Sequence, residues 1–397
     1  TVGNCIKAAH NRIEPDIGVR LHGLRRICVD ETSYRKGHAY ITVVYDMDKN
    51  QVVWVHPNHG KEVFEAFCQL LSKEEQAAIE IVAGDGAKWI DSCTKEYFPN
   101  ATRCIDFFHV VEWANEALDD VRANTAAKAR REYVQQKAAF RKEEAELKQH
   151  IADAKEELAV MPKRGRPSKR RKELEAFLQE QTLLATLEGT VTKGPGRPRS
   201  DQFSPDHQDI LDDLAQRVKD IKGSKYALGH KPENRTENQN EKIALIENAY
   251  PDLYRAYQLK ETLRLILHFK DTDLAEAELD KWISDAAESG LKPMQELAEK
   301  ISRHRENILH SIRFQANSAK SESTNTTIKA MIKMARGFRN LENMIALIYL
   351  KCSDLVIPLN NRAQPSSERR NEMRRKVSEQ RKAREAAQTG FVAAQPL

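Results

Sequence analysis

Apolar and polar residues alternate with two different periods over the first third of the chain. Five short apolar runs predict strands, and between them two stretches carry apolar residues on one face of a helix. The predicted strands cover residues 27–30, 39–45, 51–55, 79–83 and 102–107, and the predicted helices cover residues 61–71 and 88–97. Asp48-Lys49-Asn50 has turn chemistry, so the second and third strands should form a hairpin. Three strands, a helix, a strand, a helix and a strand make an α/β order with a mixed sheet.

The remainder of the chain has a helical pattern. Residues 110–160 are rich in Glu, Lys, Ala and Arg around a thin apolar stripe, which predicts a long helix or a helical hairpin with a coiled-coil-like seam. Further helices are predicted at residues 174–187, 208–221, 241–270, 275–289, 294–310 and 321–352, and another at residues 2–13. The polar tail after Pro358 alternates basic and acidic residues and is expected to be disordered or a frayed helix.

Composition narrows the class of protein. Of 397 residues, 31% are charged and only 7% are aromatic, which favours long solvated helices beside a compact core. The net charge of +5 is only a weak pointer to nucleic acid. The six cysteines never occur at Cys-x-x-Cys spacing, so neither a disulfide framework nor a zinc finger is expected, and a reduced, cytoplasmic protein is the simplest interpretation.

Two further absences in the sequence set expectations. No apolar run approaches the roughly 18 residues of a membrane-spanning helix, so no membrane association is expected. The chain begins at Thr1, with neither an initiator Met nor a signal peptide, which suggests a processed or truncated chain.

Three acids are candidates for a metal site. Asp30 is predicted at the end of a buried strand, where a charge needs a partner or a metal. Asp85 follows the fourth strand, so both carboxylates meet at one edge of the sheet if the two strands are adjacent and parallel. Adjacent carboxylates raise each other's pKa, and Mg²⁺ or Mn²⁺ relieves that repulsion. Glu322, which opens a helix and shares a face with Asn325, is the third candidate.

The alternatives are turn or cap roles for the aspartates and a helix-dipole role for Glu322. Glu31 should point to the opposite face of the strand from Asp30.

Four sequence blocks carry a resemblance to a known family. The block Val29-Asp30-Glu31-Thr32-Ser33-Tyr34-Arg35-Lys36-Gly37-His38 resembles the first catalytic block of DDE transposases of bacterial insertion sequences, closest to the ISL-three family. The other matching blocks are Gly84-Asp85, Phe98-Pro99-Asn100-Ala101 leading to Asp106-Phe107-Phe108-His109-Val110, and Glu322-Ser323-Thr324-Asn325 leading to Gly337-Phe338-Arg339-Asn340. The resemblance covers about residues 1–352.

The resemblance implies an α/β fold with an RNase H-like mixed five-stranded sheet and flanking helices, interrupted by a large all-α insertion. It implies that Asp30, Asp85 and Glu322 bind two Mg²⁺ (or Mn²⁺) ions. The implied domains are a remnant of an N-terminal helix-turn-helix region and linker (1–23), the first part of the core (24–118), the helical insertion (119–315), the last core helices (316–357) and a basic tail (358–397). Family members begin with a zinc-binding segment that helps to recognise the transposon end, and this sequence has no such cysteine cluster.

Asp106 and His109 form an Asp-x-x-His pair like one found between the second and third acids of related transposases. The resemblance implies that the pair organises the active site or contacts DNA. The alternatives are a core histidine bonded to a backbone carbonyl, and Asp106 in place of Asp85 as the second metal ligand.

Basic residues in three places are candidate DNA contacts. They are Arg35 and Lys36 beyond the first acid, Lys329, Lys333, Arg336 and Arg339 after Glu322, and Arg164, Arg166 and Arg197 in two Gly-Arg-Pro segments. These segments resemble AT-hook cores, which insert Arg into a narrow A·T minor groove. Exposed turns, a solvated helix face and a basic linker are the respective alternatives.

The leading hypothesis is a transposase that cleaves DNA and transfers strands by two-metal phosphoryl transfer, acting on transposon ends and target DNA. A catalytically inactive DNA-binding derivative and a metal-dependent nuclease without strand transfer are the competing hypotheses. A homodimer or larger synaptic complex in the bacterial cytoplasm, at the nucleoid, is expected.

Overall fold

A mixed five-stranded sheet forms one end of the molecule. The computed structural model describes residues 2–13, 18–35, 37, 39–162, 168–189, 203–316, 319–335, 337–353, 355 and 375. The strands are β1 (Arg26–Arg35), β2 (Ala39–Asp46), β3 (Gln51–Pro57), β4 (Ile81–Gly84) and β5 (Thr102–Ile105). Their order is β3-β2-β1-β4-β5, with antiparallel pairing among β1, β2 and β3 and parallel pairing of β1 with β4 and of β4 with β5. The predicted RNase H-like mixed sheet is confirmed.

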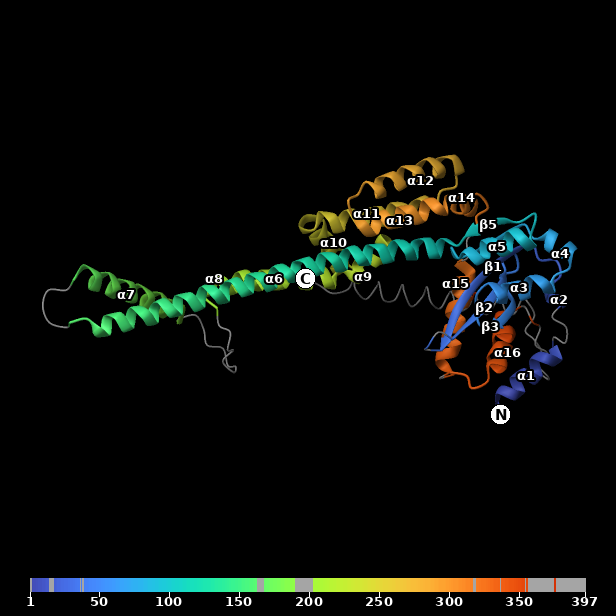
Figure 1. Cartoon of the computed structure of the whole chain (residues 1–397). Helices are drawn as coiled ribbons and strands as arrows, with labels where there is room; N and C mark the ends of the chain where they lie inside the picture. The colour runs from blue at the N-terminus through green and yellow to red at the C-terminus, as the bar shows by residue number, and fades with distance from the viewer. Residues whose placement is uncertain are drawn as a thin grey trace, which may run out of the picture.

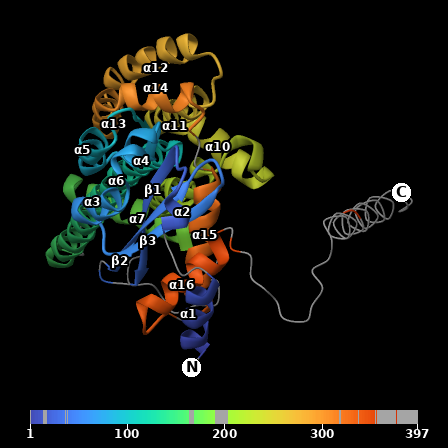
Figure 2. The same cartoon turned by 90° about the vertical axis from the view of Figure 1, so that its right-hand side faces the viewer.

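Helices cover both faces of the sheet (Figure 2). On one face lie α3 (Lys61–Leu70), α4 (Lys73–Ala78) and α5 (Lys88–Tyr97), and on the other lie α15 (Ala319–Met334) and α16 (Leu341–Cys352).

The alternation of side chains along β1 determines which residues meet which helices. Ile27 and Val29 pack into the cluster that contains the α3 residue Phe64, whereas Cys28 packs into the cluster that contains the α15 residue Ile328. Because successive side chains of a strand point to opposite faces, Asp30 follows Cys28 onto the α15 side.

Each of the two edge strands donates a backbone hydrogen bond to a side-chain hydroxyl of a helix. The backbone N–H of Val55 on β3 donates to the Tyr349 hydroxyl of α16 at 2.8 Å. The backbone N–H of Ile105 on β5 donates to the Ser311 hydroxyl of α14 (Arg305–Arg313), also at 2.8 Å. Edge backbone groups that are paired in this way cannot template intermolecular strand pairing.

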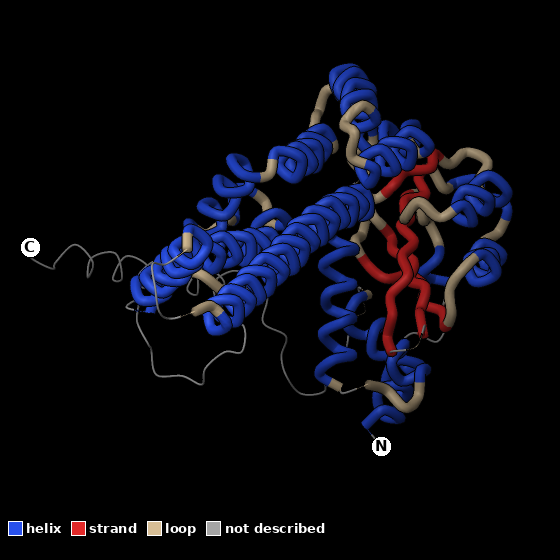
Figure 3. Tube along the Cα trace, turned by 60° about the vertical axis from the view of Figure 1, so that its left-hand side comes forward, coloured by secondary structure: helices blue, strands red, loops and turns tan. Residues whose placement is uncertain are grey.

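A long helical region leaves the sheet at β5 (Figures 1 and 3). Helix α6 (Phe107–Val160) has 54 residues and is about 80 Å long at the usual helical rise. The remaining helices of this region are α7 (Lys169–Gly189), α8 (Pro205–Gly223), α9 (Lys225–Gly229), η1 (Pro232–Asn234), α10 (Glu237–Ala249), α11 (Pro251–Ile266), α12 (Thr272–Ala287), α13 (Lys292–Arg303) and α14. Ile105, at the end of β5, belongs to the same hydrophobic cluster as Trp282 and Ile301, so the helical region is rooted directly in the sheet.

Several predicted boundaries are wrong for local reasons. The first strand was predicted to end at Asp30, but β1 continues to Arg35 because it stays paired with β2. The fifth strand was predicted to reach residue 107, but β5 ends at Ile105 because the Asp106 carboxylate caps α6. Helix α4 was not predicted; its short run depends on a capping box in which Ser72 and Glu75 satisfy each other's backbone N–H.

Three predicted helices are each divided in two. The predicted helix 241–270 is α10 and α11, divided at Pro251; 294–310 is α13 and α14, divided at His304; and 321–352 is α15 and α16, divided by residues that include Gly337, whose φ is +91°. The predicted N-terminal helix is α1 (Val2–Ile13), which packs on α16 with the His10 and Tyr349 rings 5.2 Å apart, and α2 (Gly18–Leu21) follows it. The predicted basic tail, 358–397, lies outside the described residues except for Arg375. In the described chain, no helix combines the length and apolar character needed to span a membrane.

Candidate active site

Asp30 and Asp85 lie at the same edge of the sheet. The parallel pairing of β1 with β4 is recorded up to Cys28 and Ala83, so each aspartate stands two positions past the last paired residue of its strand. On its other side Asp30 stays paired with Val43 of β2. A Cβ at Gly84 would lie 2.9 Å from the Val29 carbonyl oxygen, so only glycine allows β4 to approach β1 this closely.

The Asp30 carboxylate is partly buried and held on several sides. Its Oδ1 accepts the Glu31 backbone N–H at 2.7 Å and lies 3.9 Å from His109 Nε2, and its Oδ2 accepts a hydrogen bond from Asn325 Nδ2. Burial raises the pKa of Asp30, and Asp106 raises it further, while His109, the Glu31 amide and Asn325 act in the opposite direction. Burial is the largest of these effects, and it disfavours the ionised carboxylate. A bound cation would act in the opposite direction and favour the ionised form.

Asn325 connects α15 to two strands. Its Oδ1 accepts hydrogen bonds from the Thr32 hydroxyl at 3.2 Å and from the Tyr45 hydroxyl, which leaves Nδ2 to donate to Asp30. Burial raises the pKa of Tyr45 well above its usual value, so its hydroxyl remains a donor. Glu322 lies in α15 three positions before Asn325, and its side chain lies outside what the structure describes.

Replacing Asn325 by alanine should destabilise the protein and slow its chemistry. The change removes three hydrogen bonds and leaves the Thr32 and Tyr45 hydroxyls without a partner that the structure records, so we expect a loss of about 2–3 kcal/mol in the free energy of unfolding. Urea unfolding measures this loss. Thr326→Ala is the matched control, because Thr326 is exposed on the same helix; an equal loss in both variants would contradict the connecting role of Asn325.

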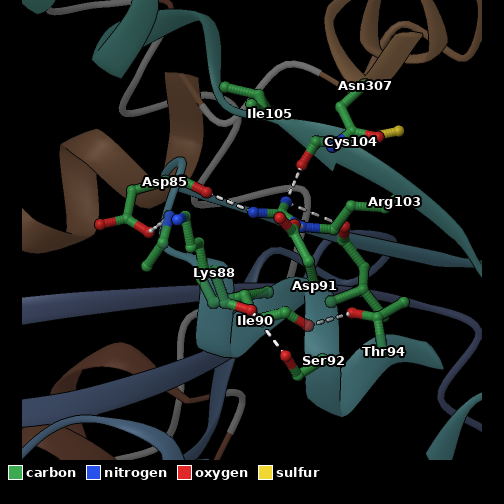
Figure 4. Close-up of polar contacts among 12 residues, drawn as sticks. Asp85, Lys88, Ile90, Asp91, Ser92, Thr94, Arg103, Cys104, Ile105 and Asn307 are labelled. Atoms are coloured by element: carbon green, nitrogen blue, oxygen red, sulfur yellow. Dashed lines mark hydrogen bonds and ion pairs between the residues drawn. The ribbon is translucent and has the colours of Figure 1, made fainter. Parts of the chain in front are cut away.

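The backbone that carries Asp85 is fixed from the adjoining strand (Figure 4). Asp85 Oδ1 accepts the Ala87 backbone N–H at 2.9 Å, which forms a tight turn. The buried guanidinium of Arg103, on β5, donates to the backbone carbonyls of Asp85 and Cys104 and to Asp91 Oδ1 at 2.8 Å. Burial lowers the pKa of Arg103, and Asp91 opposes that shift. Arg103 therefore holds the main chain at Asp85 without using its carboxylate.

Asp106 and His109 approach Asp30 from the first turn of α6. Asp106 is a buried residue, and its carboxylate accepts the Phe108 backbone N–H at 3.0 Å as the helix N-cap. His109 lies between two carboxylates, with Nε2 3.9 Å from Asp30 and Nδ1 3.4 Å from Glu112. The two ring nitrogens thus face carboxylates rather than a backbone carbonyl.

Glu31 is held by partners other than those of Asp30, although Asp85 and Asp30 add to the rise in its pKa that burial causes. Its Oε1 accepts the Gly60 backbone N–H at 3.0 Å, and its Oε2 lies 3.5 Å from His59 Nδ1. Glu31 is thus held by the loop before α3, as expected from the alternation of side chains along a strand.

Sequence reasoning missed three residues of the site: Thr32, Tyr45 and Arg103. Thr32 and Tyr45 act through Asn325, which lies 293 and 280 positions away in the chain, so no local pattern connects them. A charged residue within the apolar run of β5 was the available signal for Arg103, since a buried charge needs partners.

The donor set fits a hard divalent cation. Carboxylate oxygens are the ligands that Mg²⁺ and Mn²⁺ prefer, and burial makes the isolated Asp30 charge costly. Among the described side chains, no group of three His, Cys, Asp or Glu is close enough to hold a metal. The third predicted ligand, Glu322, is not one of these side chains.

The predicted DNA contacts are only partly described. Arg35, Lys329, Lys333 and Arg339 are exposed, Lys329 and Lys333 lying one and two turns beyond Asn325 on α15. Lys36, Arg164, Arg166, Arg197 and Arg336 lie outside the described residues.

Comparison with known proteins reveals extended similarity. A family model described as a transposase, of the DDE type and the ISL-three group, matches residues 27–188 and 200–348. The transposase for insertion sequence element IS1557 of Mycobacterium tuberculosis is 35% identical over 333 residues, covering 83% of this chain and 61% of that protein. The transposase for insertion sequence element IS1001 of Bordetella parapertussis is 22% identical over 317 residues, covering 80% of this chain and 58% of that protein. The chain thus spans about three fifths of the length of the relatives it matches.

Proposed function

Because the chain belongs to the ISL-three family of DDE transposases, we propose that it cleaves DNA at transposon ends and joins the ends to target DNA. The observation that carries this proposal is the convergence of His109 and Asn325 on Asp30, at the sheet edge that Asp85 shares. These residues come from a strand, the first turn of α6 and α15, so the arrangement is too specific for an ordinary turn aspartate. If Asp30 had only a structural role, no cation would offset the free-energy cost of burying its charge.

We propose that Asp30, Asp85 and Glu322 hold two Mg²⁺ (or Mn²⁺) ions. When bound, such ions activate a water or a DNA 3′-OH for in-line attack and stabilise the leaving oxygen. The protein's own contribution is positioning. Asn325 orients Asp30 Oδ2 through its bonds to Thr32 and Tyr45, and the Glu31 amide holds Oδ1. His109 places its imidazole ring beside the same carboxylate.

The remaining parts of the proposal concern partners. Arg35, Lys329, Lys333 and Arg339 are exposed cations suited to phosphate contacts, which give salt-dependent and sequence-independent affinity. Two transposon ends must be paired for joining, so we propose at least a homodimer, with the helical insertion, 119–315, as the interface. Action on DNA in the bacterial cytoplasm, at the nucleoid, follows from this function.

Incubating the protein with Mn²⁺ and labelled ends of the element that encodes it, one uncleaved and one pre-cleaved, tests the proposal. We expect a strand-transfer product, detected as labelled end DNA joined to a target plasmid, and none when EDTA replaces Mn²⁺. Cleavage without joining would instead support the metal-dependent nuclease. Binding with neither reaction would support the inactive derivative, and either of these results contradicts the proposed cleavage and joining activity.

A further inference from the structure

The turn after Asp85 packs directly against the helical region. A Cβ at Gly86 would lie 2.9 Å from the Trp113 ring and 3.1 Å from His304 Nε2. Any larger side chain at position 86 would push these residues away. The helical region therefore contacts the residue that follows Asp85. The contacting residues are Trp113 of α6 and His304, which lies between α13 and α14.

Lys300 of α13 lies on the same tryptophan. Its Nζ is 3.9 Å from the centroid of the Trp113 ring, a cation–π contact. Burial lowers the pKa of Lys300, while Glu116, Asp85 and Glu112 act in the opposite direction. Among the described residues, no carboxylate oxygen lies within 4.0 Å of the Lys300 ammonium, so the ammonium forms no ion pair with them. Its close contact is with the face of the Trp113 ring.

We propose that Lys300, held on Trp113, contacts a backbone phosphate of the DNA strand that reacts at Asp30 and Asp85. DNA phosphates that approach two carboxylates are repelled unless a positive charge is fixed nearby. An ammonium acts as a point charge for a phosphate, and stacking on an indole limits the positions it can take. This inference rests on the proposed function and adds a phosphate-binding residue supplied by the helical region.

The competing explanation is mechanical, because Lys300 could serve only to hold α13 against α6. A mechanical role predicts lost stability and no change in the number of phosphate contacts. Lys300→Met separates the two explanations, since the methionine keeps an apolar stem against the Trp113 ring and removes only the charge. Lys300→Arg restores the charge. Lys292→Gln is the control for net charge, because Lys292 is on the same helix with an 85% exposed side chain.

The experiment measures the affinity of each variant for a fluorescein-labelled DNA duplex of mixed sequence over a range of salt concentrations. We expect Lys300→Met to weaken binding about threefold to tenfold and to reduce the slope of log affinity against log salt by about 0.9, the value for one phosphate contact. Lys300→Arg should recover the wild-type slope, and Lys292→Gln should match the wild type. In Mn²⁺-dependent cleavage, Lys300→Met should raise KM with little change in kcat.

Wild-type affinity and slope in Lys300→Met would overturn the inference, as would an equal loss in Lys292→Gln. Far-UV circular dichroism and thermal melting establish that each variant is folded. If Lys300→Met does not fold, Lys300→Gln takes its place; it also removes the charge, so the slope should fall by the same amount. Failure of the proposed function can be distinguished from failure of this inference, because in the former case the wild-type protein itself shows no metal-dependent cleavage.

Discussion

Asp30→Asn should abolish metal-dependent DNA cleavage, lowering its rate on the order of a thousandfold or more, while DNA binding persists. Asparagine has the shape of aspartate, and its Oδ1 can still accept the Glu31 N–H that Asp30 Oδ1 accepts. The variant loses the charge that would hold a cation, and it also loses the hydrogen bond that Asp30 Oδ2 accepts from Asn325 Nδ2, because an amide NH2 group cannot accept one. Gel-based cleavage of labelled DNA in Mn²⁺ measures the loss, and fluorescence anisotropy measures binding.

Glu31→Gln is the matched control for this experiment. Glu31 is the adjacent acid in the chain, and it bonds to Gly60 on the opposite face of β1. We expect cleavage by Glu31→Gln to stay within a few-fold of the wild type. We also expect Mn²⁺ to raise the melting temperature of the wild type but not of Asp30→Asn, because a ligand stabilises only a folded state that binds it. Cleavage that survives in Asp30→Asn would exclude the proposed triad.

The second large effect is expected from Asp85→Asn compared with Asp106→Asn. Both aspartates accept a backbone N–H two positions ahead, from Ala87 and Phe108 respectively. Asparagine can accept the same bonds and is as good an N-cap as aspartate, so each change removes a charge and keeps the local fold. We expect Asp85→Asn to lower cleavage on the order of a thousandfold, and Asp106→Asn to lower it less than about tenfold.

The comparison decides which aspartate is the second metal ligand. The reverse result, with Asp106→Asn inactive and Asp85→Asn active, would assign the ligand to Asp106. Melting temperatures of both variants within a few degrees of the wild type are required, because Asp106 also caps a helix of 54 residues. Loss of activity in both variants, with both folded, would indicate that both charges act in the site.

The order of strands and helices along the first third of the chain could be predicted from the sequence, because the pattern that indicates each element is local. Apolar runs of four to eight residues bounded by turn residues predict strands, and one-sided apolar spacing predicts α3 and α5. Element ends were less predictable. The end of β1 depends on pairing with β2, and the junction between β5 and α6 depends on a single side-chain bond from Asp106.

The residues of the site were likewise only partly predictable from the sequence. Asp30 and Asp85 could be singled out as acids after apolar runs, and the spacing of Glu322 and Asn325 puts both on one helix face. The partners of Asn325 could not be inferred, because Thr32 and Tyr45 meet it only when α15 packs on the sheet. Arg103 likewise acquires its role from carbonyls on the adjoining strand.

The sequence by itself determined the α/β order, the helical nature of the long middle region and the acids available for metal chemistry, since these follow from side-chain periodicity and residue type. Only the tertiary structure decided that Asp30 lies beside His109 and Asn325, that Glu31 has other partners, and that Lys300 stands on Trp113, which packs against Gly86. The physical reason is that hydrogen bonds and charge contacts act over a few ångströms, whereas these residues are separated by up to 295 positions in the chain. Burial of the apolar faces of the sheet and helices brings them together.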